Sequence, residues 1–276
     1  RRLLDRLIGP VEASGLISRV SRIVFVPHVE LHYLPFAALV DDADRPLIER
    51  YQLSVTPSAS VWLALGERSR SGQGTGVLAM APRPDALPAS RREVAAIREH
   101  LGGEVQAATG AAASEQAFRR EAPSRRILHL ATYGVLNKHN PLFSYIELAA
   151  AGEYDGRLEV HEVFGMRLTA DLVVLSACQT GLGSGALADV PPGDDWVGLA
   201  RAFLHAGASS VIATLWPVDD WATAALMERF YAELATGIAP RLALARAQRT
   251  LRRERATSHP FYWAGFVIVG GADAHR

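Results

Sequence analysis

The sequence comprises 276 residues, of which 49% are hydrophobic and 21% are charged, and its 29 basic side chains balance 29 acidic ones. This composition predicts a soluble globular protein, and the zero net charge gives no electrostatic case for binding nucleic acid. The single cysteine excludes an internal disulfide, and no apolar run reaches the roughly 18 residues of a membrane span. We therefore expect a reducing, cytoplasmic location and no membrane contact.

The first predicted element is an amphipathic helix at the N-terminus. Its apolar positions, Leu3, Leu4, Leu7 and Ile8, fall on one helical face. The leading arginines precede no uninterrupted apolar core and no small-residue cleavage site, so this segment does not resemble a signal peptide. We expect the chain to be the C-terminal part of a longer protein.

Short apolar runs then alternate with helical patterns, which is typical of a mostly parallel sheet covered by helices. The predicted strands are 22–27, 51–55, 76–81, 126–131, 145–149, 171–177 and 209–216. The predicted helices are 58–66, 89–101, 114–121, 196–206, 221–236 and 240–255. A continuous apolar run such as Leu172 to Leu175 suits a strand that is buried on both faces.

The best candidate linker is the polar, glycine-rich stretch 66–76. It divides the chain into an N-terminal part, 1–66, and a compact α/β part, 67–276. The strands before the linker can still pair with the main sheet, so the two parts together can form one domain.

Two predicted strands are each followed by a segment of small residues, "ATYG" at 131–134 and "ACQTG" at 177–181. Ligands of open α/β sheets bind beyond the carboxyl ends of the strands. If these two strands are neighbours, Tyr133 and Cys178 face one crevice.

Cys178 is the only cysteine and therefore the only candidate thiol nucleophile. Such a nucleophile needs a cationic neighbour or a base, usually histidine, to lower a thiol pKa of about 8.5. Gly134 and Gly181 would let backbone N–H groups approach a substrate carbonyl and stabilise an oxyanion. On spacing alone, a lone cysteine at the end of a buried strand is more often a small core residue.

The ordered motifs along the chain resemble the CHAT domain, a caspase- and separase-related cysteine peptidase family that is often attached to tetratricopeptide repeats in bacteria. The motifs that carry this resemblance are "VPHVELHYLPFAAL", "YQLSVTPSASV", "LHLATYG", "NPLFSYIELA", "LVVLSACQTGLG", "GLARAFLHAGASSVIATLWPVDD" and "HPFYWAGFVIVG". The resemblance implies a three-layer α/β/α caspase-like fold with a mostly parallel central sheet. It also implies a protein or peptide substrate or partner, and adjacent domains such as helical repeats.

The resemblance implies that Cys178 is the nucleophile and that the family's base histidine falls at position 133, where this chain has tyrosine. The earlier histidine of the motif, His129, lies four residues upstream, or roughly 13 Å along an extended strand. We therefore interpret His129 as a strand histidine that is hydrogen-bonded within the fold. His139 and His161 are histidines that loops could bring near Cys178, but neither matches the base position.

A tyrosine phenol has a pKa near 10 and is a poor base at neutral pH. Positioned acid–base catalysis is worth about 10² to 10⁴ in rate. We therefore predict a catalytically impaired module that binds a peptide or partner protein. The alternative is an active cysteine endopeptidase that cleaves a partner protein after a neighbouring domain activates it.

Several acidic residues follow the cysteine, and family relatives use acidic side chains to accept a basic substrate side chain. The candidates here are Asp189, Asp194 and Asp195, with Asp219 and Asp220 further along the chain, and a solvated loop charge is the default interpretation for each. The tryptophans Trp196, Trp216, Trp221 and Trp263 are interpreted as core or helix-cap packing.

Metal and cofactor signals are weak. His28, Glu30 and His32 would share one face of an extended strand, but no third or fourth ligand is evident. A zinc deaminase site needs a Cys-x-x-Cys pair, which a single cysteine excludes. The "GLGSG" at 181–185 lacks the third glycine of the dinucleotide fingerprint. We predict neither a metal nor a cofactor.

Overall fold

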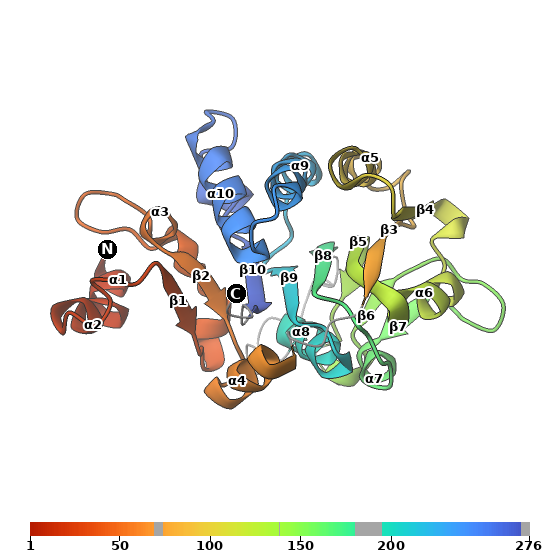
Figure 1. The fold of residues 1–276 in the computed structure, drawn as a ribbon, viewed down its shortest axis with the longest axis horizontal. Helices are drawn as coiled ribbons and strands as arrows, with labels where there is room; N and C mark the ends of the chain where they lie inside the picture. Colours follow the sequence, from red (N-terminus) through yellow and green to blue (C-terminus); the bar gives the residue numbers. More distant parts are fainter. Residues whose placement is uncertain (69–73, 138, 180–194, 272–276) are drawn as a thin grey trace.

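The computed structural model describes residues 1–68, 74–137, 139–179 and 195–271. The fold is built around one twisted sheet (Figure 1). Ten strands belong to this sheet: β1 (Arg22–Phe25), β2 (Gln52–Val55), β3 (Thr75–Ala81), β4 (Val105–Thr109), β5 (Arg125–Val135), β6 (Tyr145–Glu147), β7 (Arg157–Glu159), β8 (Leu172–Gln179), β9 (Ser210–Thr214) and β10 (Phe266–Gly270).

The strand order is β1-β2-β10-β9-β8-β5-β3-β4, and β6 pairs with β5 while β7 pairs with β6. Neighbours along the main path are parallel except for the antiparallel pair β9 and β10. The short strands β6 and β7 pair in antiparallel fashion. The predicted mostly parallel sheet is therefore confirmed.

Helices cover both faces of the sheet and complete three layers (Figure 1). One layer contains α3 (Leu47–Arg50), α5 (Ala89–Leu101), α9 (Asp220–Ala235) and α10 (Pro240–Arg253), and α9 packs against both α5 and α10. The opposite side carries α1 (Arg2–Leu7), α2 (Gly9–Ala13), α4 (Ala59–Arg68), α6 (Glu115–Glu121), α7 (Val160–Phe164) and α8 (Asp195–Ala206). Short 3₁₀ turns join these elements at Val29–Tyr33, Phe36–Ala38, Gly110–Ala112, Ala122–Ser124, Pro141–Phe143 and Pro260–Tyr262.

The two faces of the sheet bury separate apolar cores, and this explains the continuous apolar run of β8. Val173 and Leu175 enter the core under α7 and α8, whereas Leu172 and Val174 enter the core under α5, α9 and α10. Successive side chains of a strand point to opposite faces, so a run that faces a core on both sides is apolar at each of these four positions.

The N-terminal segment departs from the predicted single amphipathic helix. Gly9 and Pro10 begin a second short helix, α2, and split the segment. Leu4 and Ile8 are buried, but Leu3 is 51% exposed, so the four predicted positions do not share one buried face. A proline cannot donate the backbone hydrogen bond that would continue the first helix.

The strands on either side of the predicted linker belong to one sheet. Strands β1 and β2 precede the linker and join the main sheet where β2 pairs with β10 through Val55 and Val269. Residues 69–73 of the linker lie outside the described residues. The division into 1–66 and 67–276 stays a prediction. No helix in the described part of the chain is long and apolar enough to cross a membrane.

Candidate functional site

The two segments singled out in the sequence are adjacent at the carboxyl edge of the parallel strands. Strands β5 and β8 are parallel neighbours, and their register pairs Tyr133 with Cys178 and Gly134 with Gln179. The condition for a shared site, that the two strands are neighbours, is therefore met.

Residues 131–134 lie inside β5 and residues 177–179 lie inside β8, although we expected loops after Ala131 and Ala177. Thr180 and Gly181 lie outside the described residues. Strand β5 continues to Val135 because β6 adds hydrogen-bonded partners at its end, with Gly134 opposite Ile146 and Val135 opposite Tyr145. Strand β8 likewise continues to Gln179 beside β5. Tertiary pairing, rather than local propensity, extends both strands.

Tyr133 is half-buried and reaches toward the segment that precedes α5. Its hydroxyl lies 3.5 Å from the carbonyl oxygen of Ala86, which is at the long limit for a hydrogen bond. Strand β6, which pairs with the end of β5, is fixed by Thr132, whose hydroxyl donates to the Glu147 carbonyl at 2.6 Å. The Glu147 carboxylate forms an ion pair with Arg83, which comes from the same segment as Ala86. The sequence carries no signal for these neighbours, because the pairing of β6 with the end of β5 joins segments that are apart in the chain.

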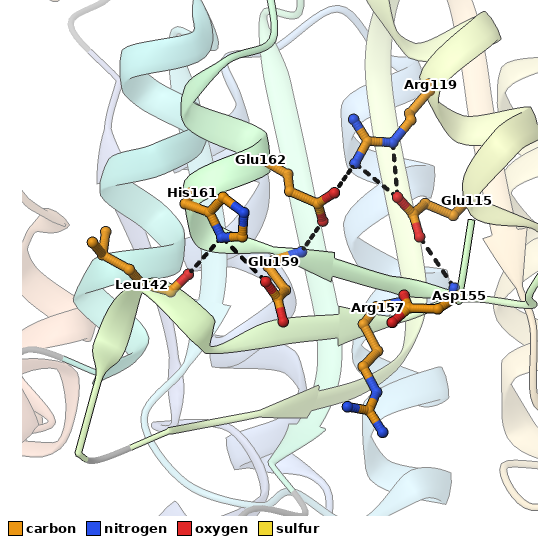
Figure 2. Close-up of polar contacts among 9 residues, drawn as sticks. Glu115, Arg119, Leu142, Asp155, Arg157, Glu159, His161 and Glu162 are labelled. Carbon is orange, nitrogen blue, oxygen red and sulfur yellow. Dashed lines mark hydrogen bonds and ion pairs between the residues drawn. The ribbon is translucent and has the colours of Figure 1, made fainter. Parts of the chain in front are cut away.

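The hairpin of β6 and β7 is anchored by a cluster of charged side chains (Figure 2). Arg119 of α6 contacts the carboxylates of Glu115 at 2.7 Å and Glu162 at 2.5 Å. Glu115 also accepts the Gly156 backbone N–H at 3.1 Å, and Glu162 accepts the Glu159 N–H at 2.8 Å. The cluster ties α6 and α7 to the hairpin that lengthens β5.

Three histidines were considered as a base for Cys178, and the structure describes the surroundings of each. His129 is fully buried and its Nδ1 lies 3.0 Å from the Tyr231 hydroxyl, which confirms its interpretation as a strand histidine bonded within the fold. His161, at the start of α7, has its Nδ1 3.1 Å from Glu159 and 3.4 Å from the Leu142 carbonyl (Figure 2). His139 is exposed.

The acidic candidates divide into two groups. Asp189 and Asp194 lie outside the described residues, and so does the "GLGSG" at 181–185; Asp195 is the first residue of α8. Asp219 caps α9 by accepting the Ala222 N–H at 2.9 Å, and Asp220 accepts the Ala89 N–H of α5 at 2.9 Å. Asp219 and Asp220 therefore each accept a backbone N–H at the start of a helix, and Asp219 is also exposed to solvent.

The tryptophans follow the prediction in part. Trp263 is buried, and the Trp216 Nε1 donates to the Phe261 carbonyl at 3.1 Å, so both pack within the fold. Trp221 instead is 51% exposed at the start of α9, which corrects its assignment to packing. The side chain of Trp196 lies outside the described part.

The "HVELH" segment is not an extended strand, which is the condition under which its polar side chains would share one face. Residues Val29–Tyr33 form a 3₁₀ turn, so His28, Glu30 and His32 lack the two-residue periodicity of a strand face. Among the described residues, no group of three or more His, Cys, Asp or Glu side chains could hold a metal ion.

The family and the fold of this chain are also shown by its similarity to known proteins. The CHAT-domain family model matches residues 1–271. Tetratricopeptide repeat protein 28 of Mus musculus and that of Homo sapiens are each 27% identical over 330 residues, which cover 98% of this chain and 13% of theirs. The chain therefore spans only a small share of the length of the curated relatives that it matches.

Two solved structures share the fold. The separase–securin complex of Saccharomyces cerevisiae matches with a TM-score of 0.63 and 13% identity, over 90% of this chain and 16% of that chain. The Arg-specific cysteine proteinase gingipain R matches with a TM-score of 0.54 and 7% identity, over 86% and 57%. The expected caspase-like α/β fold is thus confirmed.

Proposed function

Since this chain belongs to the CHAT-domain family, we propose that it is a peptidase-fold module that binds a protein or peptide partner and has lost most of its catalytic activity. The single observation that carries the proposal is the residue at position 133. It is the register partner of Cys178, it corresponds to the family's base position, and it is tyrosine.

The chemistry behind the proposal is the proton balance of a thiol. Attack on a peptide carbonyl needs the Cys178 thiolate, and the amine that leaves must receive a proton. Histidine can take and return that proton near neutral pH, whereas a phenol holds its proton up to about pH 10. A tyrosine hydroxyl can donate a hydrogen bond to an oxyanion, but this bond does not activate the thiol.

A partner protein or peptide is the ligand class that the relatives favour. The separase structure is a complex with securin, and the mammalian relatives are named for tetratricopeptide repeats. In this proposal helical repeats accompany the module in a longer chain. Gly134 offers an oxyanion N–H, and Asp189, Asp194 and Asp195 accept a basic side chain of the ligand.

One observation favours a second candidate, an endopeptidase that a neighbouring domain activates. Only one catalytic position departs from the family pattern, and the cysteine itself is present beside it. This candidate requires another group to take the proton from Cys178.

The experiment compares the wild-type chain with the Tyr133→His, Tyr133→Phe and Cys178→Ala variants. Each protein is incubated with a peptide library and, separately, with a thiol-reactive peptide probe. We expect cleavage and fast probe labelling with Tyr133→His, and neither in the wild type. Tyr133→Phe removes only the hydroxyl and should match the wild type. Fast, Cys178-dependent cleavage by the wild type would refute the loss of activity and favour the second candidate.

A further inference from the structure

A buried polar cluster lies on the α5 and α9 side of the sheet, next to the strand ends that carry Tyr133 and Cys178. Its four side chains come from four different elements and are at most 4% exposed: Glu93 of α5, His129 of β5, Ser176 of β8 and Tyr231 of α9. None of the four has a role in the proposed chemistry. Burying a carboxylate is costly unless it is bonded and paired, so the contacts of Glu93 need an explanation.

Glu93 is the centre of the cluster. The Ser176 hydroxyl donates to its Oε2 at 2.6 Å, the short distance typical of a charge-assisted hydrogen bond. The Nε2 of His129 lies 3.2 Å from the same oxygen, but it is not aligned as a hydrogen bond, so this contact is electrostatic. The Nδ1 of His129 lies 3.0 Å from the Tyr231 hydroxyl.

The protonation of Tyr231 completes the cluster. Burial, with the nearby Glu93 carboxylate as a second cause, raises the pKa of Tyr231 well above its usual value near 10. The hydroxyl therefore keeps its proton and can donate to the His129 Nδ1, which leaves the Nε2–H facing Glu93.

The cluster is attached to the two strands close to the candidate site. Ser176 precedes Cys178 by two residues on β8, and it is in register with Ala131, two residues before Tyr133 on β5. The period of two places Ser176 and position 178 on the same face of the strand. Helix α5 thus contacts β8 through the Ser176 hydroxyl, two residues before the candidate nucleophile.

We infer that Glu93 is a positioning residue, which holds the carboxyl end of β8 against α5 and so fixes position 178 beside position 133. The inference rests on the proposed function only in taking position 178 as the reactive position. The Ser176–Glu93 hydrogen bond lies three residues before Gln179, where the described part of β8 ends.

Amide hydrogen exchange of residues 175–179 in the full chain tests this tie. Ser176→Ala and Glu93→Ala should each make these amides exchange at least about tenfold faster. Glu93→Gln keeps an oxygen that accepts from Ser176 and should preserve slow exchange. The matched control is Ser210→Ala, because Ser210 is equally buried, donates to the Asp171 carbonyl at 2.8 Å and lies at the other end of the sheet, beside Leu172.

A second readout follows the thiol itself. Cys178 is the only cysteine, so alkylation by iodoacetamide reports this position alone. Ser176→Ala and Glu93→Ala should shift the pH profile of alkylation in the same way, while Glu93→Gln and Ser210→Ala should leave it as in the wild type.

The inference is overturned if Ser176→Ala changes exchange and alkylation no more than Ser210→Ala does, or if Glu93→Gln is as damaging as Glu93→Ala. Neither readout needs peptidase activity or a partner. A chain that neither cleaves nor binds peptides would refute the proposed function and leave this test intact.

Discussion

Tyr133 and Cys178 are register partners on the adjacent parallel strands β5 and β8. Neighbouring parallel strands lie about 4.8 Å apart, so the two backbones are held at a fixed, short separation. In the function proposed above, the side chain at position 133 therefore determines whether the thiol at position 178 can be activated.

The Thr132 hydroxyl should contribute measurably to the free energy of unfolding, because it fixes β6 to the end of β5. Thr132→Val keeps the shape but leaves the Glu147 carbonyl without its 2.6 Å donor. We expect a loss of about 1–3 kcal/mol in the free energy of unfolding, measured by urea denaturation. Thr169→Val removes an exposed hydroxyl that donates to the Pro123 carbonyl and should cost under about 0.5 kcal/mol. Equal losses in the two variants would show that Thr132 has no special part.

The cluster in Figure 2 predicts unequal roles for two neighbouring arginines. Arg119 is 23% exposed and contacts Glu115 and Glu162, whereas Arg120 is 68% exposed and contacts Glu121. Arg119→Met should leave the buried Glu115 without its cation and cost about 1–3 kcal/mol. Arg120→Met should cost under about 0.5 kcal/mol, because exposed ion pairs contribute little. Thermal and urea unfolding of both variants measure the difference, and equal costs would contradict the assignment.

Tyr231 predicts how stability changes at alkaline pH. Burial raises its pKa in the folded chain well above 10, so the folded state keeps a proton that the unfolded chain releases near pH 10. The folded state then binds more protons, and the free energy of unfolding should fall above pH 10 by up to about 1.4 kcal/mol per pH unit. Tyr231→Phe removes this group, so its stability should fall less steeply between pH 9.5 and 11. The same slope in both proteins would show that Tyr231 ionises normally in the folded state.

Sequence periodicity predicted the long elements well, since each carries its own signal. Helix α5 spans Ala89–Leu101 as predicted, and the apolar run of β8 indicated a strand buried on both faces. The strands that were not predicted are β4, β7 and β10. The three residues of β7 are too few to show a period, and a short apolar run like that of β10 does not distinguish strand from helix.

The pairing of positions 133 and 178 was predictable from the sheet rule and the family resemblance, but their immediate surroundings were not. Glu93 sits in a charged stretch of α5 that resembles a solvated helix face, and its burial depends on Ser176 and His129, distant in sequence. Trp221 differs from the prediction in the opposite direction, because this aromatic residue was predicted to pack within the fold and is exposed. Contacts between remote segments decide both outcomes.

The central claim is that the tyrosine at position 133 is what silences this peptidase fold. The most direct test is kcat/KM for one cleavable peptide, measured for the wild type and for Tyr133→His, with Cys178→Ala as the blank. The account predicts a gain of about 10²- to 10⁴-fold for Tyr133→His, which is the usual contribution of a positioned acid–base group. A wild-type chain that already cleaves the peptide as fast as the Tyr133→His variant would contradict it.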